Sequence, residues 1–337
     1  MANHYAARGH RVSVITWDDG TLPPVYSLSP AVTHIPLMLT QPSRSLTEAI
    51  RHNARRLVHL RRAVRASAPE RIISFMEHTN VMTVLAALGL GIPVTVMERS
   101  DPRVWPPEAI WRALRLAIYP LADRIVVQTE EAKTYFPAWL QRRIQCLPNP
   151  IAPSLQSRDQ AASPRAVVAV GRFAPVKRFD LAMHAMARLR DRFPDARLTL
   201  VGDGPLRPAH ERLCEILRLG EVVRFVGDVK DVGSSLAQAT IFLLPSDFEG
   251  FPNALGEAMA AGLAVIATAT AGAKAMIRDG VDGILTPVGD VDALTAALER
   301  LFSDRELRER LSQRAPEVVA RFAPMEIARQ WDTLLAD

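Results

Sequence analysis

The sequence predicts an α/β protein of two doubly wound domains, each built on a parallel sheet. Short apolar runs of strand length alternate with amphipathic segments of helix length, and this alternation is typical of βαβ units. The length of 337 residues exceeds a typical single core, which favours two domains. A stretch short of structure-forming residues divides the chain, so we expect a first domain at 1–150, a linker at 151–164 and a second domain at 165–322.

The first domain is expected to begin in an unusual way. Met1–Ala7 reads as the end of a helix and Arg8–His10 as the turn after it. Such a unit normally follows a first strand and a Gly-rich loop, so the sequence predicts a sheet that lacks its first strand, truncated by a misplaced initiation codon or by real loss. Strands are expected at Arg11–Thr16, Thr33–Leu37, Arg71–Phe75, Pro93–Met97, Asp123–Thr129 and Ile144–Leu147. Helices are expected at 45–66, 110–121 and 130–136, with a loop and a helix within 76–88.

The second domain repeats this alternation of strands and helices. Strands are expected at Arg165–Val170, Arg197–Val201, Val222–Val226, Ile241–Leu244 and Ala264–Thr268, and the segment Gly283–Thr286 follows them. Helices are expected at Leu181–Arg192, Arg207–Leu219, Ala254–Ala261, Val291–Ser303, Arg305–Arg321 and Met325–Ala336, with a loop around Gly272. In parallel sheets of this kind ligands bind beyond the carboxyl ends of the strands, so polar residues in those loops are candidates for a site.

Composition and motifs exclude several classes of protein. A hydrophobic fraction of 48% and a mean hydropathy of +0.05 are those of a globular chain, and no apolar run approaches the ~20 residues of a membrane-spanning helix. We expect no secretory signal, because no charged-then-apolar leader opens the sequence. Cys146 and Cys214 lie far apart without ligand-type neighbours, which argues against a metal site or disulfide framework and fits a reducing cytosol. The motifs of phosphoryl transfer, hydride transfer, metalloproteases and serine hydrolysis are absent.

Positive charge is concentrated in the first half of the chain. Residues 1–150 contain 18 Lys and Arg against 11 Asp and Glu. Much of this excess lies in the expected helix 45–66, whose other positions carry apolar residues at helical spacing. Two interpretations stay open: a solvated surface helix, or a basic helix that lies on an anionic membrane surface. Nucleic acid is not expected as a partner, because no recognised reading motif or interleaved aromatic residues accompany the charge.

One stretch in the second domain carries two carboxylates eight positions apart, between a buried strand and a helix. Glu249 stands in the loop and Glu257 in the first turns of the helix. Between them, residues 250–253 place free backbone N–H groups at a helix N-terminus, where a phosphate is favoured. An anion held between two carboxylates that can accept hydroxyls is typical of a sugar-nucleotide site. Taken singly, each carboxylate has an ordinary explanation as a first-turn or a solvated loop residue.

A second candidate loop follows the first strand of the same domain. Gly171 allows a sharp turn there, and Arg172 and Lys177 supply a guanidinium and an ammonium that suit a diphosphate. Asp290 and Asp292 resemble the D-x-D of metal-dependent transferases, but they fall at an expected helix N-cap, so we assign them no metal.

Together, E-G-x-P-x-x-x-x-E and G-R-F-x-x-x-K-R resemble the signature of retaining glycosyltransferases of the two-Rossmann-domain (GT-B) type, in family GT4. The resemblance implies two Rossmann-like domains, with the C-terminal helix 323–337 packing back on the first, acceptor-binding domain. It implies a metal-independent reaction without a cofactor, in which the leaving diphosphate itself takes the acceptor's proton. It assigns Arg172 and Lys177 to the diphosphate, Glu249 to the donor sugar and Glu257 to the ribose hydroxyls. The donor-binding residues are then Gly171, Arg172, Lys177, Glu249, Gly250, Phe251, Pro252, Asn253 and Glu257.

The first half resembles a bacterial subgroup that extends lipid-linked oligosaccharides, through Glu98-Arg99-Ser100-Asp101-Pro102. This implies transfer of a hexose or N-acetylhexosamine, with a UDP-sugar favoured, to a lipid-linked saccharide at the cytoplasmic face of the membrane. His78, Glu98 and Arg99 are the acceptor-side candidates, because they follow expected strand ends. Two alternatives stay open: a non-catalytic nucleotide-sugar-binding protein, and an epimerase or phosphorylase on the same fold.

Overall fold

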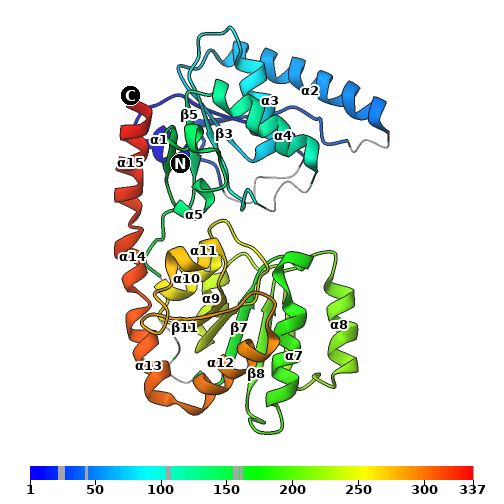
Figure 1. The fold of residues 1–337 in the computed structure, drawn as a ribbon, viewed down its shortest axis with the longest axis vertical. Helices are drawn as coiled ribbons and strands as arrows, with labels where there is room; N and C mark the ends of the chain where they lie inside the picture. The colour runs from blue at the N-terminus through cyan, green and yellow to red at the C-terminus, as the bar shows by residue number, and fades with distance from the viewer. Residues whose placement is uncertain (22–26, 42–44, 104–107, 155–158, 160–161, 337) are drawn as a thin grey trace. The chain divides into compact units, whose positions relative to one another are not determined.

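The structure of the protein is a computed structural model that describes residues 1–337 except 22–26, 42–44, 104–107, 155–158, 160–161 and 337 (Figure 1). Most of the expected linker 151–164 therefore lies outside the described residues. The chain divides into two compact units. The first comprises Met1–Val127, Phe136–Gln145 and Leu334–Asp337, and the second comprises Gln128–Tyr135 and Cys146–Thr333.

The strands of the first unit form two separate sheets. β1 (Val12–Thr16) pairs in parallel with β2 (Val32–Pro36), and a four-stranded sheet has the order β3–β4–β5–β6. Its strands are Ile72–Phe75, Val94–Met97, Arg124–Val127 and Ile144–Cys146. Among the described residues β1 pairs with β2 alone, and β3 pairs with β4 alone. The unit's helices are α1 (Ala2–Ala7), α2 (Leu46–Ser67), α3 (Glu77–Ala87), α4 (Ala109–Ile118) and α6 (Ala138–Gln141).

Helix α2 joins the two sheets of the first unit through a shared core. It begins at Ser45, whose hydroxyl accepts a hydrogen bond from the Glu48 backbone N–H, so the sequence itself fixes the helix start. Its buried residues Leu60 and Val64 pack with α3 and with partly buried side chains of both β1 and β3. The face of α2 opposite this core is exposed.

The second unit is built on one sheet with the order β12–β11–β10–β7–β8–β9, in which every registered pair is parallel. The strands are β7 (Ala166–Val170), β8 (Arg197–Val201), β9 (Val223–Gly227), β10 (Ile241–Leu244), β11 (Ala264–Thr268) and β12 (Ile284–Thr286). The helices are α5 (Glu130–Lys133), α7 (Phe179–Leu189), α8 (Arg207–Ile216), α9 (Val232–Ala237), α10 (Asn253–Ala260), α11 (Ala271–Met276), α12 (Val291–Ser303), α13 (Arg305–Arg314), α14 (Glu317–Arg321) and most of α15 (Pro324–Ala336), whose residues from Leu334 on belong to the first unit.

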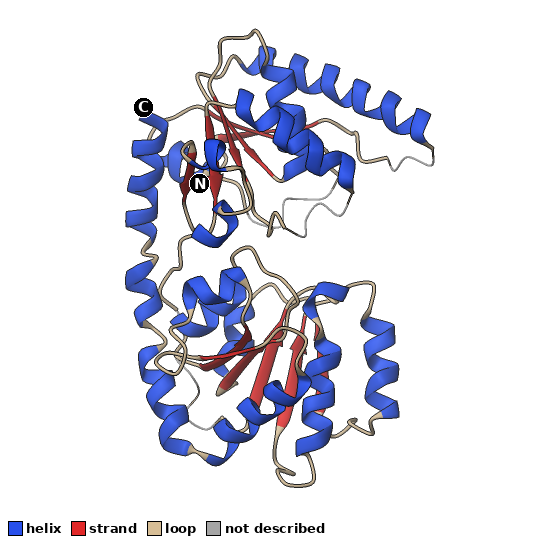
Figure 2. Ribbon diagram, in the orientation of Figure 1, coloured by secondary structure: helices blue, strands red, loops and turns tan. Residues whose placement is uncertain are grey.

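Helices cover both faces of this sheet (Figure 2). Alternate residues along β7 point into two different cores: Val167 and Ala169 pack with α7 and α12, whereas Val168 and Val170 pack with α10 and α14. The strand order reverses at β7, which has β8 on one side and β10 on the other. In doubly wound sheets the loops leaving two such neighbouring strands diverge and create a ligand-binding crevice.

Two expectations for the second unit were wrong in detail. The expected loop around Gly272 is helix α11, which begins at Thr270, whose hydroxyl accepts from the Ala273 N–H. Gly272 serves close packing instead, since a Cβ there would lie 2.5 Å from Pro252 Cδ and 2.8 Å from the Gly250 carbonyl. The expected helix 305–321 is two helices, α13 and α14, because the proline at position 316 lacks an N–H to continue the first.

Candidate active site

The loops after β7 and β10 meet at the point where the strand order reverses. The Asp247 N–H donates to the Val176 carbonyl at 2.8 Å, so the two loops are tied through their backbones. The 3₁₀ turn Pro175–Lys177 and the loop from Ser246 to Pro252 therefore form one local structure. The two motifs quoted above thus lie together although more than sixty residues of chain separate them.

Lys177 and Glu249 form an ion pair between these loops. The Lys177 Nζ lies 2.6 Å from Glu249 Oε1, and the two side chains are 20% and 13% exposed. The buried Ser246 hydroxyl donates to the same carboxylate oxygen at 2.7 Å, and its own carbonyl accepts from the Thr268 hydroxyl. Two polar contacts therefore fix the Glu249 carboxylate in the loop, and its negative charge is balanced by Lys177.

Arg172 lies in the loop after β7, five residues before Lys177, with an exposed side chain that makes no polar contact in the part of the chain that the structure describes. Its loop packs tightly on the next one, since the Phe173 N–H donates to the Asp203 carbonyl at 2.8 Å. Glycine is required where these loops meet: a Cβ on Gly202 would lie 2.2 Å from the Gly171 carbonyl oxygen. The Arg172 guanidinium is thus presented to solvent from a rigid base, and it is available to an anion.

The N-terminus of α10 offers backbone donors next to Glu249. The helix has Pro252 as its N-cap residue, without a side-chain cap. Among the described residues, no acceptor lies within hydrogen-bond distance of the N–H groups of Gly250, Phe251 and Asn253. Phe251 is buried edge-on against Phe322, and this packing holds the loop in place. Orphan N–H groups at the positive end of a helix dipole are a favourable site for a phosphate oxygen.

Glu257 lies one turn into α10 with an exposed side chain. It has no polar partner in the described ranges of the chain. Neighbouring protein atoms nevertheless raise the pKa of its carboxyl by desolvation. An unpaired carboxylate at this place can accept two hydroxyl groups, such as those of a ribose.

The second unit therefore brings together the residues that the sequence analysis selected as donor-binding. Lys177 contacts Glu249, while Arg172, Glu257 and the α10 N–H groups are available around them. No group of three or more His, Cys, Asp or Glu side chains among the described residues could hold a metal ion. Asp290 caps α12 by accepting from the Ala293 N–H at 2.9 Å, as the sequence predicts.

The acceptor-side candidates lie at strand ends of the first unit, but Glu98 is turned inward. It is 1% exposed, accepts a 2.6 Å hydrogen bond from the Tyr119 hydroxyl, and lies 3.5 Å from the buried Arg115 guanidinium. Burial, which outweighs the opposing Arg115 charge, raises the pKa of Glu98 to about 7. Arg115 in turn donates to the Pro102 carbonyl at 2.7 Å, so the pair anchors the segment that follows β4.

His78 and Arg99 lie nearer the surface of the first unit. The His78 ring packs edge-on against Trp111 with centroids 4.2 Å apart, and its side chain is 42% exposed. The Arg99 guanidinium lies over the Phe75 ring at 5.8 Å. Sequence reasoning missed Ser246, Arg115 and Tyr119, because nothing in the local pattern marks a residue whose partner comes from a distant element.

Two family models together match residues 1–318. The model described as Glycosyltransferase Family 4 matches residues 1–155, and the model described as Glycosyl transferases group 1 matches residues 155–318. Among solved structures, sucrose-phosphate synthase from Thermosynechococcus elongatus aligns with a TM-score of 0.84 at 22% identity, covering 99% of this chain and 90% of that one. HepE from Anabaena, solved with UDP and glucose, aligns at 0.79 and 17% identity over 98% of this chain and 94% of its own. The fold is therefore GT-B.

Three curated relatives indicate which kinds of enzyme this chain is similar to. An N-acetyl-D-galactosaminyltransferase of Campylobacter jejuni, named for a PP-undecaprenol-linked saccharide, is 29% identical over 82% of this chain and 77% of its own length. An exopolysaccharide phosphotransferase of Streptomyces coelicolor is 33% identical over 65% of this chain and 24% of its own, and LpsE of Rhizobium meliloti is 33% identical over 53% and 52%. The matched part of the chain thus spans from 24% to 77% of the length of these relatives. With both domain families present in order, it belongs to the GT4-type, GT-B glycosyltransferases and is a transferase enzyme.

Proposed function

We propose that the protein transfers a hexose or N-acetylhexosamine, with retention of configuration, from a UDP-sugar to a lipid-linked saccharide in cell-surface glycan synthesis. The observation that carries the donor half is the Lys177–Glu249 ion pair beside unpaired α10 N–H groups, at the point where the sheet order reverses. The observation that carries the acceptor half is the similarity to the Campylobacter enzyme, whose name specifies a lipid-linked saccharide.

In this proposal the two cations and the helix N-terminus bind the diphosphate. A nucleoside diphosphate carries about two charges on its diphosphate, and these increase as the glycosidic bond breaks. Arg172 and Lys177 supply two positive charges, and the N–H groups of residues 250–253 supply donors that need no reorganisation. Glu257 accepts the ribose hydroxyls. This distribution explains how a diphosphate could be stabilised here by side chains and backbone, without a metal ion.

The sugar end of the donor would lie at Glu249. Lys177 and Ser246 hold this carboxylate, so its orientation is fixed by the protein itself. When the diphosphate binds, Lys177 can shift toward it, and Glu249 can then accept sugar hydroxyls. The departing diphosphate takes the proton of the acceptor hydroxyl on the same face, which gives retention and needs no separate general base.

The acceptor would bind through the first unit, with helix α2 on the membrane. Arg51, Arg55, Arg62 and Arg65, here called the basic stripe, lie on the exposed face of α2 at spacings of four, seven and three residues. Ile50 and Val58 lie beside them, 64% and 47% exposed. Cations beside exposed apolar side chains suit an anionic lipid interface, so we place the protein at the cytoplasmic face of the membrane as a peripheral protein. None of the helices described is long and apolar enough to cross a bilayer.

The test is a transfer assay with a panel of UDP- and GDP-sugars and synthetic polyprenyl-diphosphate saccharides, with and without EDTA. We expect one UDP-sugar to give an axial glycosidic product of retained configuration, unaffected by EDTA, and little product with the same saccharide lacking its lipid. Inverted product would contradict the mechanism. Equal rates with lipid-free saccharide would contradict the acceptor assignment, and EDTA-dependent turnover would contradict metal independence.

A further inference from the structure

Three consecutive residues tie the Lys177 loop to the Glu249 loop. Val176 accepts from the Asp247 N–H through its carbonyl, Lys177 pairs with Glu249, and Arg178 pairs with Asp247. The middle contact belongs to the proposed donor site, and a donor would draw Lys177 away from Glu249. The outer two contacts involve no group that is proposed to touch the donor, so they can persist when it binds.

Arg178 has a backbone conformation that is unfavourable for an arginine. Its backbone is left-handed, with φ 46° and ψ 41°, between the 3₁₀ turn and the first residue of α7. Non-glycine residues rarely adopt this conformation, and glycine would adopt it without strain. The side chain is therefore expected to provide an interaction that offsets the backbone strain.

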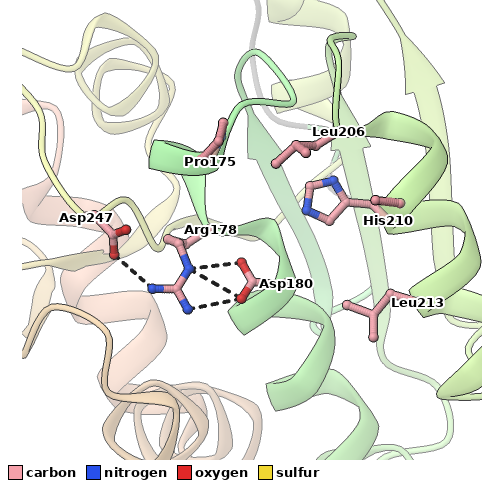
Figure 3. Close-up of a pocket in the computed structure, with 8 residues that line it drawn as sticks. Pro175, Arg178, Asp180, Leu206, His210, Leu213 and Asp247 are labelled. Atoms are coloured by element: carbon pink, nitrogen blue, oxygen red, sulfur yellow. Dashed lines mark hydrogen bonds and ion pairs between the residues drawn. The ribbon is translucent and has the colours of Figure 1, made fainter. Parts of the chain in front are cut away.

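The Arg178 guanidinium bridges two carboxylates on different elements. Nε and Nη2 donate to Asp180 in the first turn of α7, at 3.0 to 3.3 Å, and Nη1 donates to Asp247 at 3.0 Å (Figure 3). All three side chains are partly buried, with exposed fractions of 30 to 40%. Because the planar guanidinium makes contacts on two of its edges, it fixes both the distance and the orientation between α7 and the Asp247 loop.

One side of the Arg178 bridge faces a pocket. The three side chains lie along a pocket of about 450 Å³, whose other walls are Pro175, Leu206, His210 and Leu213 (Figure 3). Since one side of the bridge is open, the two carboxylates rather than apolar neighbours determine where Arg178 lies. Lys177 directly precedes Arg178 in the chain, so a change in the bridge would move the Lys177 backbone relative to Glu249.

We propose that Arg178 is a positioning residue for the donor diphosphate, which through Asp180 and Asp247 sets the separation of the Lys177 and Glu249 loops. This inference rests on the proposed function, because it assumes that Lys177 binds the diphosphate. It assigns to Arg178, Asp180 and Asp247 a role in transfer that requires no contact with the substrate.

The test compares Arg178→Gly with a matched variant, Arg218→Gly. Arg218 is also a left-handed arginine, with φ 54°, but it lies exposed after α8 and its side chain makes no polar contact with a described residue. Both changes relieve the same backbone strain, so neither should lower the thermal unfolding temperature. We expect Arg178→Gly to raise the dissociation constant of UDP and the donor KM by about tenfold and to lower kcat, with Arg178→Lys intermediate and Arg218→Gly unchanged.

Hydrogen exchange in the ligand-free protein separates this inference from the proposed function. The Asp247 amide should exchange at least about tenfold faster in Arg178→Gly than in the wild type and in Arg218→Gly. Unchanged exchange would overturn the positioning role whether or not the protein binds UDP. If the Asp247 amide exchanges faster in Arg178→Gly, but the folded wild-type protein binds no nucleotide, the proposed function is overturned instead. Faster exchange with unaltered UDP binding and turnover would overturn the link between the bridge and Lys177.

Discussion

The Lys177 Nζ lies 2.6 Å from Glu249 Oε1 and joins two loops of the second unit, and the Ser246 hydroxyl donates to the same Glu249 oxygen. This contact joins the two halves of the proposed donor site. It also makes the two residues competitors, since a diphosphate would draw Lys177 from Glu249. Variants of the two residues should therefore have opposite effects on the binding of UDP alone.

Removal of the carboxylate charge with Glu249→Gln should strengthen the binding of UDP by up to about tenfold, because Lys177 no longer has an anionic partner. The same change should lower kcat by about 100-fold or more, because it weakens the grip on the donor sugar. Calorimetric titration with UDP and a steady-state transfer assay measure the two effects. Lys177→Ala provides the comparison, and its UDP binding should weaken; parallel changes in the two variants would contradict the assignment.

Replacement of the ribose-facing carboxylate with Glu257→Ala should weaken UDP binding by about 10- to 100-fold, the range for hydrogen bonds to a charged group. A ligand without ribose hydroxyls makes this specific. Wild-type protein should bind 2′,3′-dideoxy-UDP much less tightly than UDP, while Glu257→Ala should bind both alike. If the variant keeps the wild-type preference for UDP, Glu257 does not contact the ribose.

The buried Glu98 should make the stability of the first unit depend on pH. The folded protein holds this proton up to a pKa of about 7, whereas an unfolded glutamic acid loses it near 4.5. The free energy of unfolding should therefore fall as the pH rises through this interval, by up to about 3 kcal/mol. Glu98→Gln should remove that fall.

Urea unfolding at pH 5 and pH 8, monitored by hydrogen exchange of residues 72–127, measures the effect of Glu98 on the free energy of unfolding. The exposed Glu70 provides the control, since Glu70→Gln should shift stability equally at both pH values. A difference between wild type and Glu98→Gln that is the same at pH 5 and pH 8 would show that Glu98 ionises normally.

The basic stripe on α2 should bind anionic vesicles through charge. Arg56 and Arg61 are not in the stripe, because they donate to the carbonyls of Leu39 and Ala86. Changing Arg55, Arg62 and Arg65 together to Glu should reduce the affinity for anionic vesicles, measured by co-sedimentation, by about 100-fold or more. This follows from ~1 kcal/mol of binding free energy for each cation near the surface. The control changes three exposed arginines of the second unit to Glu: Arg212, Arg218 and Arg310. Equal sedimentation with neutral lipid, or insensitivity to salt, would contradict membrane binding through charge.

The sequence was sufficient to predict the fold class and most of the elements. Apolar runs such as Ile241–Leu244 mark buried parallel strands, and caps such as Ser45 and Asp290 mark helix starts. Gly272 misled the analysis, since a glycine needed for close packing has the same local signature as one needed for a turn. Local patterns cannot show which distant surface approaches a residue.

The candidate donor site was predicted by motif, but its internal contacts were not. Lys177 and Glu249 were each selected, yet their ion pair depends on the order of β7 and β10 in the sheet. The inward orientation of Glu98 likewise depends on Tyr119 and Arg115 from α4 and the turn after it. Contacts of this kind arise from tertiary packing, so the structure is needed to find them.

Calorimetric titration of the wild-type protein and Lys177→Ala with UDP, GDP and their common sugars, with and without EDTA, tests the central claim most directly. The account predicts saturable binding of UDP or a UDP-sugar by the wild type, unchanged by EDTA and weakened by about tenfold or more in Lys177→Ala. Binding that is equal in the two proteins, or no binding by a wild type shown to be folded, would contradict it.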